Sequence, residues 1–120
     1  MASRRSEYQN DAKLRVMQII NNSPHLTSRQ IAQKVGISNG SAYYLLTSLI
    51  DKGIVKLANF KENSQKMKYS YLLTPKGIHE KSLLTNSFLV RKKDEYRALR
   101  NEIAQLERDI GINTEFNNNE

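Results

Sequence analysis

Residues 26–50 read LTSRQIAQKVGISNGSAYYLLTSLI, and this stretch decides the fold. Thr27 is followed three residues later by Gln30, the capping-box pattern that begins a helix. Gly36 suits the left-handed conformation that closes a helix, and Ser38 suits the N-cap of the next one. The sequence therefore predicts two helices separated by about three residues, which is the short, steep connection of a helix-turn-helix.

The second of these helices has one apolar face, because its apolar residues recur at the spacing of helical turns. The residues of that face are Ala42, Leu45, Leu46, Leu49 and Ile50. At about 100° per residue, Gly40, Tyr44 and Thr47 point the opposite way. Tyr43 lies on the flank, where it could also pack against a neighbouring strand. A helix that turns these side chains to solvent is expected to contact another molecule.

The segments around this pair complete a recognisable fold. Residues 6–21 carry apolar side chains over a broad helical arc, and Pro24 ends that helix. Residues 54–60 and 67–73 are rich in β-branched, aromatic and aliphatic residues, which predicts two strands. The polar segment 61–66 between them predicts a hairpin with a basic tip. The expected fold is mainly α with a small β-hairpin (α+β), a winged helix-turn-helix.

A last, long helix is predicted after the hairpin, since Thr74 suits its N-cap and Pro75 its first position. After Gly77, near its start, the next glycine is Gly111 and no proline intervenes, so this helix reaches about 50 Å. Its second half has a heptad seam that only Lys92 interrupts. The seam residues, predicted to form a dimer interface, are Leu89, Tyr96, Leu99, Ile103, Leu106 and Ile110.

These segments predict three parts of the chain. Residues 1–74 form a winged helix-turn-helix domain, residues 75–111 form a long helix with a dimerisation seam, and residues 112–120 form a polar flexible tail. The charges beside the seam leave open whether two such helices run parallel or antiparallel.

The net charge of +7 is confined to the first part of the chain. Up to Thr74 there are eleven basic and four acidic residues, whereas eight of each follow. A polyanion is therefore expected to dock on the first part. The absence of cysteine fits a reducing compartment, and no apolar segment reads as a signal or a membrane span. We expect a cytoplasmic protein.

The sequence offers little support for catalysis. His25 and His79 lie far apart and outside any metal-ligand spacing, and no paired carboxylates stand in an apolar setting. The glycines form no phosphate-binding loop. We therefore expect no enzyme activity, no metal and no cofactor.

Small polar residues at the start of the third helix suit a close approach to phosphates. Asn39 also carries the amide pattern that matches an adenine edge. Alternatively, Ser38 only caps the helix, and the hairpin lysines only keep a loop solvated. Arg29 stands at the start of the supporting helix, where backbone contacts are usual. The predicted DNA-contacting residues are Arg29, Ser38, Asn39, Gly40, Ser41, Tyr43, Tyr44, Thr47, Lys61, Lys66 and Lys68.

Two quoted segments, LTSRQIAQKVGISNGSAYYLLTSLIDKGIV and NFKENSQKMKYSYLLTPKGIHEKSLLT, together with the closing helix, resemble the EPS-associated MarR-type regulators. These are found near exopolysaccharide loci, and the likeness spans residues 14–110. The resemblance implies a homodimer that binds operator sites in double-stranded DNA and controls exopolysaccharide genes. Dimerisation through the terminal helix would place two recognition helices about 34 Å apart, which predicts an inverted-repeat operator. It places the third helix in the major groove and the hairpin along the backbone. The phenolic ligand pocket of larger MarR relatives is not carried over, so a small-molecule effector stays open.

A second hypothesis is a protein-interaction adaptor whose coiled coil pairs with a different chain. A winged surface without excess positive charge would favour it, contrary to the charge division above. RNA binding ranks third, because the chain lacks the aromatic sheet motifs of common single-strand binders.

Overall fold

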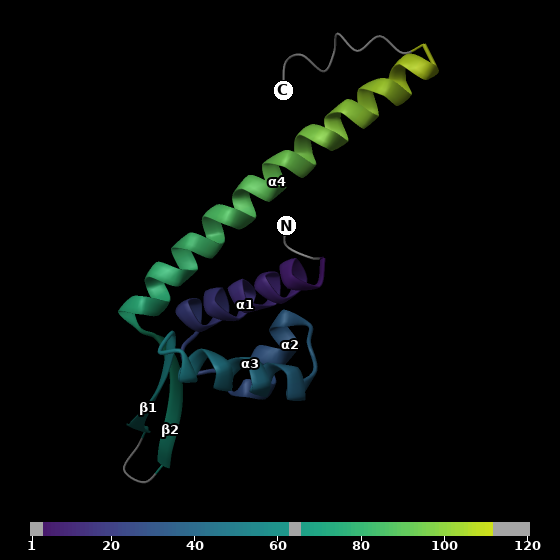
Figure 1. The fold of residues 1–120 in the computed structure, drawn as a ribbon. Coiled ribbons are helices and arrows are strands. Elements are labelled where there is room, and N and C mark those ends of the chain that lie inside the picture. Colours follow the sequence, from purple (N-terminus) through teal and green to yellow (C-terminus); the bar gives the residue numbers. More distant parts are fainter. Residues whose placement is uncertain (1–3, 63–65, 112–120) are drawn as a thin grey trace. The chain divides into compact units, whose positions relative to one another are not determined.

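The computed structural model describes residues 4–62 and 66–111 (Figure 1). The side chains at 4, 5, 60–62 and 66–68 are not among those described. The elements follow the predicted order of three helices, a hairpin and a long helix. They are α1 (Arg4–Asn22), α2 (Ser28–Val35), α3 (Asn39–Asp51), β1 (Val55–Glu62), β2 (Lys66–Leu73) and α4 (Pro75–Asp109).

The chain forms two compact units, residues 1–85 and residues 86–120. The first unit holds α1 to α3, the hairpin and the first turns of α4. Its core lies where the three helices meet the start of the hairpin. The side chains buried together there are Val16, Met17, Ile20, Ile31, Leu46, Leu49, Ile54 and Val55. The predicted mainly α architecture with a small hairpin is confirmed.

The helix-turn-helix begins and ends as its local sequence predicts. The Thr27 hydroxyl accepts from the Gln30 amide at 3.1 Å, and the Gln30 side-chain oxygen accepts from the Thr27 amide at 2.9 Å. Gly36 closes α2 at φ 82°, a left-handed conformation that glycine adopts without a steric penalty. Ser38 then caps α3. The capping residues, which act locally, were all predicted correctly.

The hairpin is longer than the sequence indicates. β1 and β2 pair antiparallel from Val55 opposite Leu73 to Glu62 opposite Lys66. The prediction of a polar loop over 61–66 is therefore wrong, since both ends of that segment are strand. The hydrogen bonds of an antiparallel ladder join backbone groups and do not depend on side-chain polarity. The two strands therefore stay paired through polar residues whose low β-propensity had suggested a loop.

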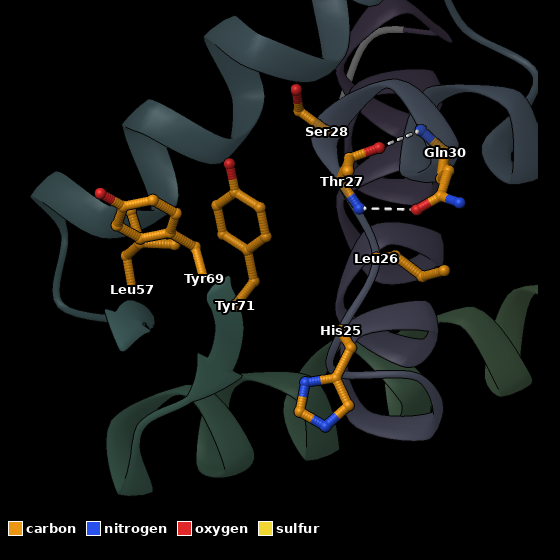
Figure 2. A pocket seen from close by; sticks show the side chains of 8 residues that line it. All are labelled: His25, Leu26, Thr27, Ser28, Gln30, Leu57, Tyr69 and Tyr71. Carbon is orange, nitrogen blue, oxygen red and sulfur yellow. Dashed lines mark hydrogen bonds between the residues drawn. The ribbon is translucent and has the colours of Figure 1, made fainter. Parts of the chain in front are cut away.

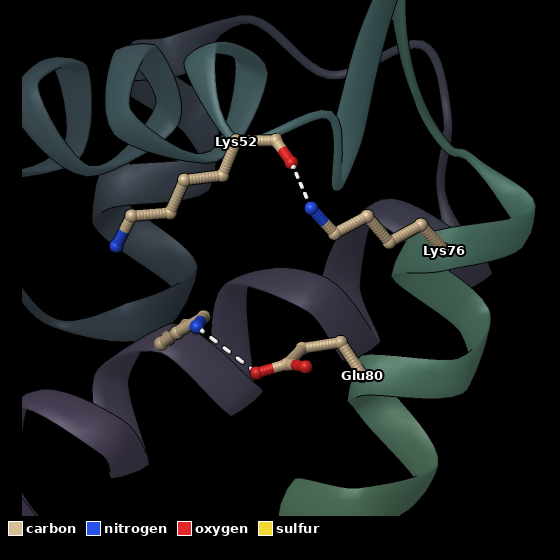
Figure 3. A network of polar contacts seen from close by, with 4 residues as sticks. Lys52, Lys76 and Glu80 are labelled. Atoms are coloured by element: carbon tan, nitrogen blue, oxygen red, sulfur yellow. Dashed lines mark hydrogen bonds and ion pairs between the residues drawn. The ribbon is translucent and has the colours of Figure 1, made fainter.

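The start of α4 is fixed against the turn that follows α3. The Thr74 amide donates to the Ile54 carbonyl at 3.0 Å, and the Thr74 hydroxyl accepts from the Gly77 amide at 3.0 Å. The Lys76 ammonium donates to the Lys52 carbonyl at 2.8 Å (Figure 3). Gly77 is buried directly beside Ile54. The first turn of α4 is thus part of the winged core.

One apolar residue of α3 is more exposed than its helical pattern predicts. Ile50 was expected on the buried face of α3, yet it is 36% exposed. It stands at the edge of an arc whose centre is Ala42, Leu46 and Leu49, so the core covers it incompletely. Ile78, one turn into α4, is also exposed.

The second unit contains α4 from Asn86 to its end at Asp109. Ion pairs between residues three positions apart lie along this helix, including Lys92 with Glu95 at 3.0 Å and Arg97 with Asp94 at 3.1 Å. These exposed pairs contribute little to stability. None of the described helices combines the length and apolar character needed to cross a lipid bilayer.

Candidate nucleic-acid interface

The first turn of α3 presents small polar groups to solvent. The Ser38 hydroxyl accepts from the Ser41 amide at 3.0 Å and donates to the Ser41 hydroxyl at 2.9 Å. Ser38 is therefore an N-cap, while its contact with DNA stays a prediction. The Asn39 side chain and the Gly40 backbone are exposed beside it. A Cβ added at Gly40 would meet no atom within 4 Å, so the space over this turn is open.

Further along α3, the side chains of Tyr43 and Tyr44 are both exposed to solvent, on different flanks of the helix. Tyr44 is 79% exposed and Tyr43 is 67% exposed. Thr47 is exposed too, but its hydroxyl donates to the Tyr43 carbonyl at 2.9 Å, one turn back. The predicted exposure of all three side chains is confirmed, while their contact with DNA stays a prediction.

Tyr43 has a neighbour on the hairpin. Burial raises the pKa of the Tyr71 phenol above its usual value, and the nearby Tyr43 phenol raises that pKa further. Tyr71 thus stays a neutral hydroxyl group at ordinary pH. Tyr43, on the flank of α3, therefore lies close to the hairpin although its side chain stays 67% exposed, and its contact with DNA stays a prediction.

Between the start of α2 and the hairpin lies a pocket of about 620 Å³ (Figure 2). Figure 2 shows the Tyr69 and Tyr71 rings on one side of it and the α2 capping box on the other. One of its lining residues, His25, is hydrogen-bonded through Nδ1 to the buried Ser70 hydroxyl at 2.6 Å. The lining residues are His25, Leu26, Thr27, Ser28, Gln30, Leu57, Tyr69 and Tyr71.

The remaining predicted DNA-contacting residues are Arg29 in α2 and three lysines of the hairpin. Arg29 is exposed in the first turn of α2, as its predicted role requires. Lys61, Lys66 and Lys68 belong to the paired strands, but their side chains lie outside the described residues. Their proposed contacts with phosphates therefore stay predictions.

On the flank of α3 that faces α1 lie two candidate residues that the sequence analysis missed, Tyr8 and Lys52. There Tyr8, in α1, lines a second cleft together with Tyr44 of α3 and Lys52, the C-cap residue of α3. Tyr8 is separated from α3 by two connections, and no local pattern signals that α1 and α3 share a cleft. The only sequence signal is an exposed aromatic residue early in α1.

The geometry agrees with known proteins. Residues 9–56, which run from α1 to the start of β1, match the family described as "Winged helix-turn-helix DNA-binding". Together with the hairpin, this match decides the fold. The first unit is a winged helix-turn-helix. Among curated proteins, no sequence match is found.

Solved winged proteins superpose on much of the chain. A PadR-like transcriptional regulator from Bacillus cereus is 16% identical, with a TM-score of 0.64 over 72% of this chain and 89% of its own. YodB from B. subtilis, in a diamide-treated form, is 18% identical, with a TM-score of 0.55 over 78% and 95%. The multiple antibiotic-resistance repressor MarR from Listeria monocytogenes is 21% identical, with a TM-score of 0.50 over 81% and 66%. At these identities the likeness shows the winged fold alone.

Proposed function

We propose that this protein is a sequence-specific transcriptional regulator that binds double-stranded DNA as a homodimer. One observation carries the proposal: a winged helix-turn-helix turns the polar and aromatic face of α3 to solvent. A helix of this width fits the major groove, where base edges carry a readable pattern of donors and acceptors. Control of exopolysaccharide biosynthesis genes belongs to the same proposal and rests on the resemblance of the quoted segments alone.

Electrostatics support a polyanionic partner for this surface. The excess positive charge lies in the first 74 residues. Arg29 is exposed, and no carboxylate among the described residues lies within ion-pair distance of its guanidinium. A positive winged surface attracts phosphates and releases their counterions, which makes affinity fall steeply with salt.

The seam of α4 supports the dimer. Its six apolar residues are between 45% and 72% exposed in the single chain. Soluble monomers rarely leave so continuous an apolar stripe in water, and two heptad seams can cover each other. Such a dimer would present two recognition helices about 34 Å apart, which predicts an inverted-repeat operator.

Footprinting of the DNA upstream of the protein's own gene tests the function. We expect two protected half-sites related by two-fold symmetry and separated by about one helical turn. Protection without symmetry would contradict the dimer geometry, and no protection would contradict the regulator. A monomer in solution that forms a 1:1 complex with another protein would instead favour the adaptor.

The first prediction concerns base reading by α3. We expect Asn39→Ala and Tyr44→Ala each to reduce the preference for operator over random DNA by about tenfold or more, because a good base contact contributes about 1–3 kcal/mol of discrimination. Both side chains are exposed, so the thermal midpoint should barely change. Competition titrations measure the ratio, and equal preference in wild type and both variants would remove these residues from the site.

Gly40 gives a second prediction, in which stability and binding change in opposite directions. The space around its Cα is open, so Gly40→Ala should raise the free energy of unfolding by about 0.5 kcal/mol through helix propensity. The added methyl group would hold the phosphate strand away from the backbone and weaken DNA binding about fivefold. Denaturant titration and DNA titration of one sample measure both effects. Unchanged affinity would show that DNA does not approach this turn closely.

A further inference from the structure

The cleft on the α1 side of α3 has a volume of about 600 Å³. Its aromatic walls are Tyr8 and Tyr44, and Gly40 and Lys52 lie at opposite ends of its α3 side. Gly40, Tyr44, Ser48 and Lys52 follow one another at four-residue steps along α3 and its C-cap, so these lining residues form one continuous row. The cleft follows α3 for about 18 Å, from its first turn to its end.

The shape of this cleft suits a strand better than a small molecule. Sites for small ligands enclose most of the ligand surface between largely apolar walls. Here the two aromatic rings stay exposed, Tyr8 by 71%, and the cleft continues into the open first turn of α3 at Gly40. A long, narrow ligand that crosses this turn can occupy it from end to end.

Charge identifies the chemistry of that ligand. Two ammonium groups line the cleft, but the Lys13 ammonium is paired with the Glu80 carboxylate at 3.4 Å. Figure 3 shows the Lys52 side chain on the opposite side from Lys76, and no carboxylate among the described residues pairs with it. The neighbouring acid Asp51 does not line the cleft. Lys52 is therefore placed to bind an external anion.

We propose that this cleft seats one sugar-phosphate strand of the DNA duplex. The Lys52 ammonium pairs with a phosphate, and the Tyr8 ring packs against the deoxyribose edge of the strand, while Tyr44 forms the α3 wall of the cleft and still reaches the bases. The proposal rests on the proposed DNA-binding function and extends its interface to α1, which makes Tyr8 a backbone-positioning residue. Such contacts fix the position of a protein on the duplex without reading its sequence.

The test measures the salt dependence of binding to a random duplex of about 30 base pairs, three helical turns. Lys52→Gln should weaken binding about fivefold and lower the slope of log affinity against log salt by about 0.9 for each protomer. Tyr8→Ala should weaken binding about threefold and leave the slope unchanged. Lys93→Gln is the matched control, because Lys93 is an exposed lysine of the second unit that does not line this cleft.

The outcomes separate this inference from the proposed function. If wild type binds with a steep slope and Lys52→Gln and Tyr8→Ala both match Lys93→Gln, the cleft proposal is wrong and DNA binding stands. If wild type does not bind the duplex in dilute salt, both proposals fail. Thermal melting of every variant shows whether it is folded. Tyr8→Phe keeps the aromatic ring and should therefore bind the duplex like wild type. Loss of binding in Tyr8→Phe equal to that in Tyr8→Ala would overturn the packing role of the ring.

Discussion

Gly77→Ala should lower the free energy of unfolding of the winged unit by about 3 kcal/mol, the upper range for overpacking a tight contact. A Cβ at this position would lie 2.1 Å from the Ile54 carbonyl oxygen and 3.3 Å from Ile54 Cγ2. The oxygen cannot move away freely, because it accepts from the Thr74 amide at 3.0 Å. Either the start of α4 shifts or these hydrogen bonds break.

Urea titration followed by circular dichroism measures this loss as a lower midpoint at unchanged slope. Gly40→Ala is the matched control, since the same methyl group is added near the start of another helix where nothing lies within 4 Å. A midpoint for Gly77→Ala equal to that of wild type would mean that α4 is not held against Ile54 in solution.

Leu99→Glu combined with Leu106→Glu should convert the proposed dimer to a monomer and weaken operator binding by about 100-fold or more. In a paired seam these positions pack against the partner helix, where an unpaired carboxylate is costly. A monomer binds a single half-site, so it loses the added affinity that comes from linking two binding events in one dimer. The variants should keep their helical content, because both leucines are exposed in the single chain.

Light scattering across a concentration series gives the oligomeric state, and DNA titration gives the affinity. Val90→Glu is the control, because Val90 is 53% exposed on the same helix but lies outside the seam. It should remain a dimer with wild-type affinity. A double variant that still dimerises would place the interface elsewhere.

The sequence predicted the parts of this fold that depend on neighbouring residues. The capping box of Thr27 and Gln30, the left-handed Gly36 and the Ser38 cap all act within one helical turn. The apolar stripe of α3 and its exposed face also follow from helical period alone. These features placed the candidate interface on α3 before its surroundings were known.

Contacts between distant residues could not be predicted in the same way. Lys13 meets Glu80 and His25 meets Ser70 across 67 and 45 residues, and no local pattern couples them. Gly77 stands in a helix where glycine is unfavourable, but only the packed structure reveals the Ile54 carbonyl beside it. The cleft that adds Tyr8 to the candidate site was missed for the same reason.

The inward hydrogen bond of Thr47 changes what this residue can offer a base pair. Its hydroxyl hydrogen is donated to the Tyr43 carbonyl, so toward DNA the side chain offers a methyl group and an acceptor oxygen, but no donor. On the proposed interface, the Asn39 amide then offers paired donors and acceptors in the first turn, while the next turns offer the Thr47 methyl group and the rings and hydroxyl groups of the two tyrosines. We expect an operator half-site with an adenine at one end and thymine methyl groups beyond it.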